Sequence, residues 1–214
     1  MTVFKNRTEA GKKLAALLVN YKGSNAIVLA LPRGGVVIGK EIARELNLPL
    51  DIIVTRKIGA PGNDEYAIGA IDILGNGVFG TGEKELVDKK WLENKITAEK
   101  KEAERRWVAY RTGRGSLDLK GKTVIIVDDG IATGLTMQAA ALYAKQIGAE
   151  KIVVAIPVAS SESVRNIKNM AEVRVLETPL FFSAVGEWYE DFPQVSDQEV
   201  VAALSSTLNK FTYI

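Results

Sequence analysis

Five short apolar runs, separated by helical patterns, constrain the fold more than any other feature of this 214-residue sequence. Such runs are typical of strands buried on both faces of a sheet, and strands of that kind are usually parallel. Right-handed helical crossovers then join one strand to the next. The sequence therefore predicts an α/β fold, with a parallel sheet of about five strands and helices on both faces. The predicted strands are 26–31, 51–55, 123–127, 152–156 and 173–176, and the predicted crossover helices are 36–46, 135–147 and 161–170.

Two regions interrupt this alternation. Residues 58–82 are rich in glycine and turn pairs, which predicts a hairpin of strands 67–74 and 78–79 inserted after the second strand. Residues 83–110 predict one long charged helix that lies solvated on the sheet. A dimer contact or a mobile arm is the alternative, and a homodimer would use Trp91 and Trp107. The helix has a narrow apolar seam made of Leu86, Val87, Trp91, Ile96, Ala103, Trp107 and Tyr110.

The length fits one domain, since a domain has roughly 150 residues. We expect a single domain over 1–214, with a core of about 24–178 and an insertion of about 58–121. The remainder, about 179–214, would form a hood or tail. A capping box from Ser196 to Glu199 predicts a final helix that runs to Leu208.

The composition excludes several kinds of chemistry. The chain has no Cys and no His, so thiol nucleophiles, Ser-His-Asp triads and zinc sites on thiolate or imidazole are absent. Any metal must bind to oxygen ligands, which favours Mg²⁺. Twenty-eight basic and twenty-six acidic residues give no charge excess, so we expect no nucleic-acid partner. With neither a signal-peptide pattern nor a membrane-length apolar run in the sequence, we expect a cytoplasmic protein without a membrane partner.

Two glycine motifs resemble nucleotide-binding loops without meeting their requirements. Residues 34–40 approach a phosphate-binding P-loop, but Glu41 stands where a hydroxyl residue would bind Mg²⁺. Residues 75–80 match G-x-G-x-x-G, but the following residues predict strand and turn instead of a helix. We interpret the first as a turn entering a helix and the second as part of the inserted hairpin.

The segment 124–136 carries the most chemical information. A buried strand delivers Asp128 and Asp129 to the carboxyl edge of the sheet, where ligands bind in open α/β folds. Gly130 is expected to bend the chain so that both carboxylates serve one ligand. Thr133, Gly134 and Thr136 then open a helix, whose N-terminal N–H groups attract anions. Carboxylates beside an anion site predict a sugar phosphate, although a helix cap with an incidental acidic pair is the alternative.

This segment resembles the signature of the type I phosphoribosyltransferases, which bind 5-phosphoribosyl 1-pyrophosphate (PRPP). Four apolar residues, two acidic residues and a Thr-Gly-x-Thr ending all match. The resemblance extends to Leu31-Pro32-Arg33-Gly34-Gly35, in the place of the family's pyrophosphate loop, and covers roughly residues 24–178. It implies a phosphoribosyltransferase, a pentosyltransferase of nucleotide metabolism that moves the phosphoribosyl group from PRPP to a nucleobase or similar nitrogenous acceptor.

The resemblance also implies roles for individual residues. Asp128 and Asp129 would hold the ribose hydroxyls and approach Mg²⁺ through ribose and pyrophosphate oxygens and water. The pyrophosphate partners would be Arg33 and Gly34, with Arg56 and Lys57 at the end of the second strand. Catalysis would depend on Asp128, Asp129, Arg33 and Lys57, and a cis peptide bond is expected between Pro32 and Arg33. The 5′-phosphate would lie on Gly130, Ile131, Ala132, Thr133, Gly134, Leu135 and Thr136.

The acceptor is not identified by the sequence. Members that use 6-oxopurines have a general-base Asp where this chain has Ala132, while adenine-type members have Ala there. Aromatic residues of the tail are candidates to stack on a planar acceptor, and Glu187, Glu190 or Asp191 could accept its N–H groups; the alternative is that the aromatics anchor the tail. The aromatic candidates are Phe181, Phe182, Trp188 and Tyr189.

Two other functions remain open at this point. One is a regulatory protein that binds PRPP without turnover and, like some members of the family, RNA as well. The other is a different phosphosugar enzyme. A closed lid is expected in a transferase because water must be kept out. Residues 59–66 and 111–115 are the candidate mobile loops.

Overall fold

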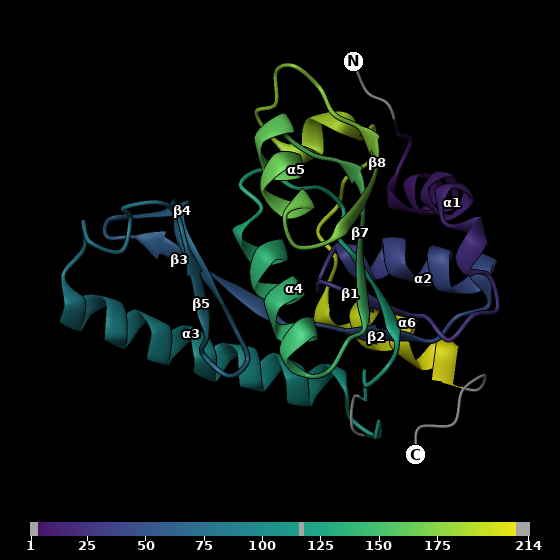
Figure 1. The fold of residues 1–214 in the computed structure, drawn as a ribbon, viewed down its shortest axis with the longest axis horizontal. Helices are drawn as coiled ribbons and strands as arrows, with labels where there is room; N and C mark the ends of the chain where they lie inside the picture. The colour runs from purple at the N-terminus through teal and green to yellow at the C-terminus, as the bar shows by residue number, and fades with distance from the viewer. Residues whose placement is uncertain (1–3, 116–117, 209–214) are drawn as a thin grey trace.

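The computed structural model describes residues 4–115 and 118–208, and its centre is a five-stranded sheet in the order β2-β1-β6-β7-β8 (Figure 1). All four neighbouring pairs of strands are parallel, as the sequence predicts. The chain runs from β1 outward to β2 and then returns to β6 on the other side of β1. The carboxyl ends of β1 and β6 therefore form the switch point of the sheet, where ligands bind in such folds. The strands are β1 (Ile27–Ala30), β2 (Leu50–Ile52), β6 (Thr123–Val127), β7 (Lys151–Val158) and β8 (Glu172–Glu177).

Helices cover both faces of this sheet (Figure 1). Successive residues of a strand point to opposite faces, so each central strand feeds two cores. In β1, Val28 and Ala30 join the cluster under α1 (Arg7–Leu17) and α2 (Gly35–Leu46). Ile27 and Leu29 join the cluster under α4 (Leu135–Gln146) and α5 (Ser161–Lys168). This double burial explains why the strands are apolar throughout.

The insertion after β2 is a separate antiparallel sheet of three strands, not the two-stranded hairpin predicted from the sequence. It consists of β3 (Thr55–Ala60), β4 (Asn63–Asp72) and β5 (Gly77–Phe79). The second strand of the main sheet ends at Ile52, because the chain from Thr55 onward pairs with β4. The sheet packs on α4 and, together with the long helix α3 (Lys89–Tyr110), forms an arm on the left of Figure 1.

The long helix begins later than predicted. Asp88 caps it by accepting a hydrogen bond of 2.8 Å from the amide of Trp91, so residues 83–88 precede the helix. Leu86 is consequently 81% exposed and does not belong to an apolar seam. Trp91 packs against the core of the antiparallel sheet, whereas Trp107 packs against the main core. The two tryptophans therefore face different neighbours within the same chain.

The start of the described chain lies against the tail segment that follows β8. Phe4 forms an isolated parallel bridge with Tyr189, just after the 3-10 helix η2 (Val185–Trp188). The predicted capping box is confirmed: Ser196 and Glu199 exchange hydrogen bonds at the start of α6 (Asp197–Leu208). A further short 3-10 helix, η1 (Val19–Tyr21), leads toward β1. Among residues 4–115 and 118–208, no helix is long and apolar enough for a membrane crossing.

Candidate functional site

The loops after β1 and β6 meet at the switch point of the sheet. The amide of Leu31 donates to the carbonyl of Val127 at 2.9 Å, which keeps the two strand ends side by side. Gly34 then approaches Asp129 so closely that an added Cβ would lie 1.8 Å from Oδ2 of that residue. Only glycine fits at position 34, because the acidic loop occupies the space that a side chain would need.

The predicted acidic pair lies at this edge. Oδ1 of Asp128 accepts a hydrogen bond of 2.8 Å from the amide of Asp129. Burial, and then the neighbouring Asp129 carboxylate, raise the pKa of the Asp128 carboxyl well above its ordinary value. A ligand that brings hydrogen-bond donors or a cation would offset the cost of charging both carboxyls.

Arg7 is the main residue of this site that the sequence does not reveal. Its Nε donates to Oδ2 of Asp129 at 2.8 Å, and its Nη1 donates to the carbonyl of Pro193 at 2.7 Å. The guanidinium also lies 3.7 Å from the ring centroid of Phe192. Arg7 stands among other charged residues near the start of the chain and belongs to no motif, so no local signal identifies it. One oxygen of Asp129 is thus held by an arginine from α1.

The predicted anion loop follows the acidic pair. Gly134 has φ of 81° and is the N-cap residue of α4. The amide of Ile131 is used, since it donates to the carbonyl of Val158 at 3.0 Å. Within the described ranges, the amides of residues 132–136 donate to no other protein group. These free amides, at the positive end of a helix, can bind an anionic oxygen.

Gly130 follows a bend in this loop. The chain bends at Asp129, as the sequence predicts, although Gly130 is not among the glycines with positive φ. An added Cβ would instead lie 2.4 Å from a methyl group of Val185 in η2. Glycine is therefore needed for the close approach of the tail segment, which packs directly on the acidic loop.

Arg33 lies in the turn before α2, after the peptide bond that the family resemblance marks as unusual. The bond between Pro32 and Arg33 is cis, which confirms that expectation. Nη1 of Arg33 is 3.8 Å from Oδ1 of Asp197, at the start of α6. The same carboxylate accepts a hydrogen bond of 2.6 Å from the hydroxyl of Tyr110. Burial and this bond raise the pKa of Tyr110 to about 12.

The placement predicted for Arg56 and Lys57 is wrong in one respect. They lie within β3 of the antiparallel sheet and not at the end of the second strand, because the main-sheet strand stops at Ile52. Arg56 forms an ion pair of 2.8 Å with Glu99 of α3, and Lys57 forms one of 3.3 Å with Glu65. A pyrophosphate role for either residue stays a prediction, and it requires each to leave a carboxylate partner.

The tail aromatics are placed in different surroundings. Tyr189 is buried, and its hydroxyl donates to the carbonyl of Asp129 at 2.6 Å. Burial raises the pKa of this hydroxyl, so it remains a donor. Phe182 and Trp188 are half-buried against the main core, whereas Phe181 is 91% exposed. The acceptor role given to these four residues is untested.

The two candidate mobile loops are ordinary parts of the fold. Residues 59–66 span the end of β3, a tight turn and the beginning of β4. At the other loop, Arg111 forms two hydrogen bonds, of 2.9 and 2.8 Å, with the buried Asp51. Arg114 contributes a further contact to the same carboxylate at 3.8 Å. Neither segment is distinguished as a lid by its contacts.

Fold and site together define an α/β protein with an anion loop and two carboxylates at the switch point of a parallel sheet. The family model described as "Phosphoribosyl transferase domain" matches residues 4–190. The chain belongs to this family of phosphoribosyltransferases.

Several known proteins are similar over nearly the whole chain. "Putative phosphoribosyl transferase Rv0571c" of Mycobacterium tuberculosis is 39% identical over 222 residues, which cover 99% of this chain and 48% of that protein. The chain thus spans about half the length of the curated relatives it matches.

Solved structures agree with the architecture. The crystal structure of TT1426 from Thermus thermophilus is 41% identical, with a TM-score of 0.81 over 96% of this chain and 99% of that chain. A Neisseria gonorrhoeae protein, solved with bound ppGpp, is 14% identical, with a TM-score of 0.52 over 96% of this chain and 97% of that one. At that identity the likeness concerns the fold alone.

Proposed function

We propose that this protein is a Mg²⁺-dependent phosphoribosyltransferase that moves the phosphoribosyl group between PRPP and a nitrogenous acceptor, with release of pyrophosphate. The observation that carries the proposal is the juxtaposition of free amides with two carboxylates. Residues 132–136 offer amide donors that bind no other described group, and Asp128 and Asp129 directly precede them. A 5-phosphorylated ribose has the same order of groups: an anion at one end and vicinal hydroxyls beside it.

The ribose and its phosphate would be held by separate parts of one loop. The amides of 132–136 and the hydroxyls of Thr133 and Thr136 would donate to the 5′-phosphate. Asp128 and Asp129 would accept hydrogen bonds from the 2′ and 3′ hydroxyls, with Arg7 keeping Asp129 in place through the bond of 2.8 Å. Hydrogen bonds to charged groups contribute about 1.5–3 kcal/mol each, enough for tight binding from few contacts.

Pyrophosphate would lie toward the loop after β1. Arg33 lies in this loop, two residues before α2, and its side chain is 38% exposed, so its guanidinium is accessible to an anion. Its contact with Asp197 is long, at 3.8 Å, and a pyrophosphate oxygen would compete with it directly. Arg33 and the amide of Gly34 are therefore the groups we assign to the leaving group.

The residues present are compatible with magnesium. Mg²⁺ is usually bound by one or two carboxylates together with substrate phosphates and several waters. Asp128 and Asp129 can supply the carboxylate ligands. The described residues contain no cluster of three or more His, Cys, Asp or Glu side chains that would hold a metal alone. The remaining ligands would come from PRPP and water, and the bound ion would neutralise charge on pyrophosphate.

The reaction needs positioning more than acid-base catalysis. The acceptor nitrogen forms a bond to the anomeric carbon as the bond to pyrophosphate oxygen breaks, and the departing oxygen keeps the electron pair. Arg33 stabilises the charge that grows on pyrophosphate. The anion loop holds the ribose in position for attack by the acceptor nitrogen. Ala132 carries no base, so the proton of the acceptor passes to pyrophosphate or water.

Two measurements test the proposal. Calorimetry with PRPP and Mg²⁺ tests binding, and pyrophosphate release in the presence of a panel of nucleobases tests turnover. We expect micromolar binding and release that depends on the base. Binding without release for every base would favour the regulatory alternative, and absence of PRPP binding would contradict both.

A further inference from the structure

The carboxylate of Asp197, at the start of α6, is surrounded by donors from two other parts of the chain. Its Oδ1 accepts a hydrogen bond of 2.6 Å from the hydroxyl of Tyr110, the last residue of α3. Nη1 of Arg33, in the loop after β1, lies 3.8 Å from the same oxygen. Nη2 of Arg105, also on α3, lies 3.8 Å from Oδ2. We call these four side chains the Asp197 cluster, in which one anion is held by a hydroxyl and two guanidinium groups.

The Asp197 cluster adjoins the switch point of the sheet. Arg33 belongs to the cluster, and the next residue, Gly34, lies directly against the acidic loop. An added Cβ at Gly34 would be 1.8 Å from Oδ2 of Asp129. Two consecutive residues therefore connect the acidic pair to the donors that surround Asp197.

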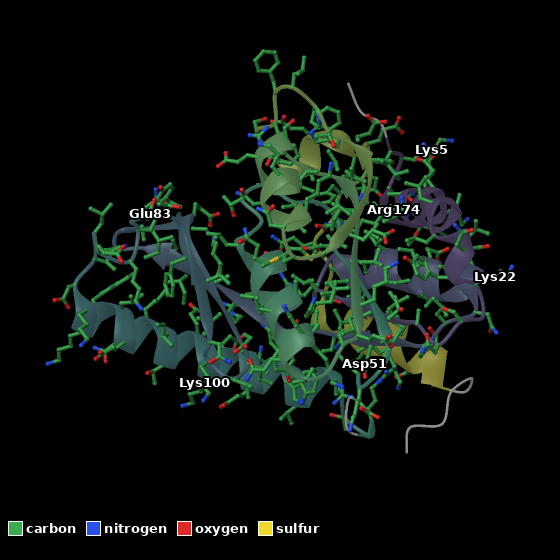
Figure 2. All side chains as sticks on the ribbon, viewed as in Figure 1. Lys5, Lys22, Asp51, Glu83, Lys100 and Arg174 are labelled. Carbon is green, nitrogen blue, oxygen red and sulfur yellow. The ribbon has the colours of Figure 1, made fainter. Side chains whose placement is uncertain are left out.

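The position of Tyr110 is fixed by the fold. The residue is 2% exposed. The next residue, Arg111, forms hydrogen bonds of 2.9 and 2.8 Å with the buried Asp51, which is labelled in Figure 2. Burial raises the pKa of the Tyr110 hydroxyl to about 12, so this group keeps its proton and remains a donor at neutral pH. A donor that is already in place binds an anionic oxygen with little further loss of side-chain freedom.

The carboxylate of Asp197 does not cap α6. Ser196 and Glu199 cap this helix through reciprocal hydrogen bonds. The side chain of Asp197 is 45% exposed, so it can exchange its partners for water. The fold therefore presents this carboxylate as a replaceable occupant of the space between Tyr110 and Arg33.

We infer that Tyr110, together with Arg33, binds the distal phosphoryl group of pyrophosphate, and that the Asp197 carboxylate occupies this place until the anion displaces it. The inference rests on the proposed function, because it deepens the leaving-group site of that reaction. Carboxylate and phosphoryl oxygens both accept hydrogen bonds from hydroxyl and guanidinium donors. Oδ1 of Asp197 contacts both Tyr110 and Arg33, so one phosphoryl oxygen in its place would reach both donors. Asp197 would then compete with pyrophosphate and favour the release of this product.

Calorimetry with inorganic pyrophosphate and Mg²⁺ tests the role of Asp197 without requiring turnover. Asp197→Asn removes the charge of the competitor and keeps its shape. Glu199→Gln is the matched control, because it removes a charge from the same turn of α6 and forms no ion pair with Arg33. We expect Asp197→Asn to tighten pyrophosphate binding about three- to five-fold, the effect of one partly exposed ion pair. Glu199→Gln should change the affinity by less than about two-fold.

Tyr110→Phe tests the donor, and it is made in the Asp197→Asn protein. In that protein the hydroxyl has no charged partner, so its loss affects mainly the bond to pyrophosphate. We expect pyrophosphate binding to weaken about ten-fold, because one hydrogen bond to a charged group is lost. The phenyl ring keeps the packing of Tyr110, and near-ultraviolet circular dichroism verifies the fold of each variant.

Three results would overturn the inference. One is an unchanged pyrophosphate affinity in Asp197→Asn, and another is an equal gain in Glu199→Gln. The third is an unchanged affinity when Tyr110→Phe is added to Asp197→Asn, which would mean that Tyr110 and Asp197 only join α3 to α6.

Titration of the same variants with PRPP and Mg²⁺ separates this inference from the proposed function. If PRPP binds but the expected order of pyrophosphate affinities is absent, the inference fails and the proposed function stands. If that order is present in a protein that does not bind PRPP, the proposed function fails and the Asp197 cluster remains a pyrophosphate site.

Discussion

Two arginine–aspartate pairs join distant parts of this chain, and they differ in what surrounds them. Asp51 is fully buried, with a side chain that is 0% exposed. Its two carboxylate oxygens accept hydrogen bonds of 2.8–2.9 Å from the Ile52 amide and from Arg111. Asp129 has a 16% exposed side chain and stands beside the free amides of the anion loop. Arg7 holds this second carboxylate at the edge of the sheet.

The difference in burial separates an ion pair that stabilises the fold from one that orients a carboxylate for a ligand. A buried pair whose groups are all satisfied fixes chain segments together and has little capacity left for a ligand. A pair at the edge orients a carboxylate that a ligand can still reach. We therefore expect changes at Asp51 to affect mainly stability, and changes at Asp129 to affect mainly PRPP binding.

The largest effect is expected from Arg111→Met. The substitution removes the cation that forms two hydrogen bonds with the buried Asp51 and leaves this carboxylate only the longer contact of 3.8 Å from Arg114. Loss of one partner of a buried ion pair costs about 3–5 kcal/mol in other proteins. The free energy of unfolding, measured by urea denaturation, should fall by that amount. Under conditions where the variant is folded, its affinity for PRPP should stay within about two-fold of the starting protein, a difference of about 0.4 kcal/mol.

Arg105→Met on α3 is the matched control. Its side chain is 54% exposed and pairs with Glu102 at 2.7 Å, so its loss should cost no more than about 1 kcal/mol. Equal losses in the two variants would show that burial does not explain the role of Asp51.

Replacement of both acids of the site, Asp128→Asn with Asp129→Asn, should have the opposite profile. PRPP binding should weaken ten-fold or more, because hydrogen bonds from ribose hydroxyls to charged oxygens are lost. Calorimetry with PRPP and Mg²⁺ measures the change, and near-ultraviolet circular dichroism verifies the fold. Unchanged affinity in the folded double variant would contradict the role assigned to the pair.

A smaller effect on the same site is expected from Arg7→Lys. Lysine keeps the charge but lacks the planar group that bonds Asp129 and Pro193 and lies over Phe192. We expect PRPP affinity to fall about three- to ten-fold, equivalent to about 1 kcal/mol. A loss in unfolding free energy with no change in affinity would mean that Arg7 only fastens the tail.

The sequence predicts the main sheet well because burial on both faces leaves an unmistakable pattern. After its first residue, the run 123–127 contains only apolar residues, so it is not confused with a loop. The sequence does not predict strand β3, because Thr-Arg-Lys-Ile-Gly-Ala does not alternate clearly. Its conformation is decided by pairing with β4, which is a tertiary effect. The predicted start of α3 is wrong because the acidic residues before Asp88 resemble a first helical turn.

The candidate site also has one part that the sequence identifies and another that it does not. Asp128 to Thr136 can be identified from the sequence because the loop is contiguous and its chemistry is local. Arg7 cannot, because it reaches Asp129 across 122 positions and no spacing rule connects them. A cavity of about 570 Å³ beside this loop is likewise assembled from β4, β5, α4 and α5. The tail aromatics form a local cluster of rings in the sequence, and their acceptor role stays a prediction.

The smallest effect is expected from Glu102→Gln. This substitution removes the charge of a partly exposed carboxylate that forms ion pairs with Arg105 and Arg106. Hydrogen bonds from Arg105 and Arg106 lower the pKa of Glu102 from 4.5 to about 2, and its side chain is 30% exposed. A lowered pKa stabilises the folded state above pH 4.5, and this contribution disappears as the pH falls toward 2. We therefore expect a loss of only about 0.3–0.5 kcal/mol at pH 7, after solvent screening, and none at the acid end of that range. Urea denaturation of both proteins at several pH values measures it. A loss at pH 7 as large as that of Arg111→Met would exclude burial as the cause of the difference between these ion pairs.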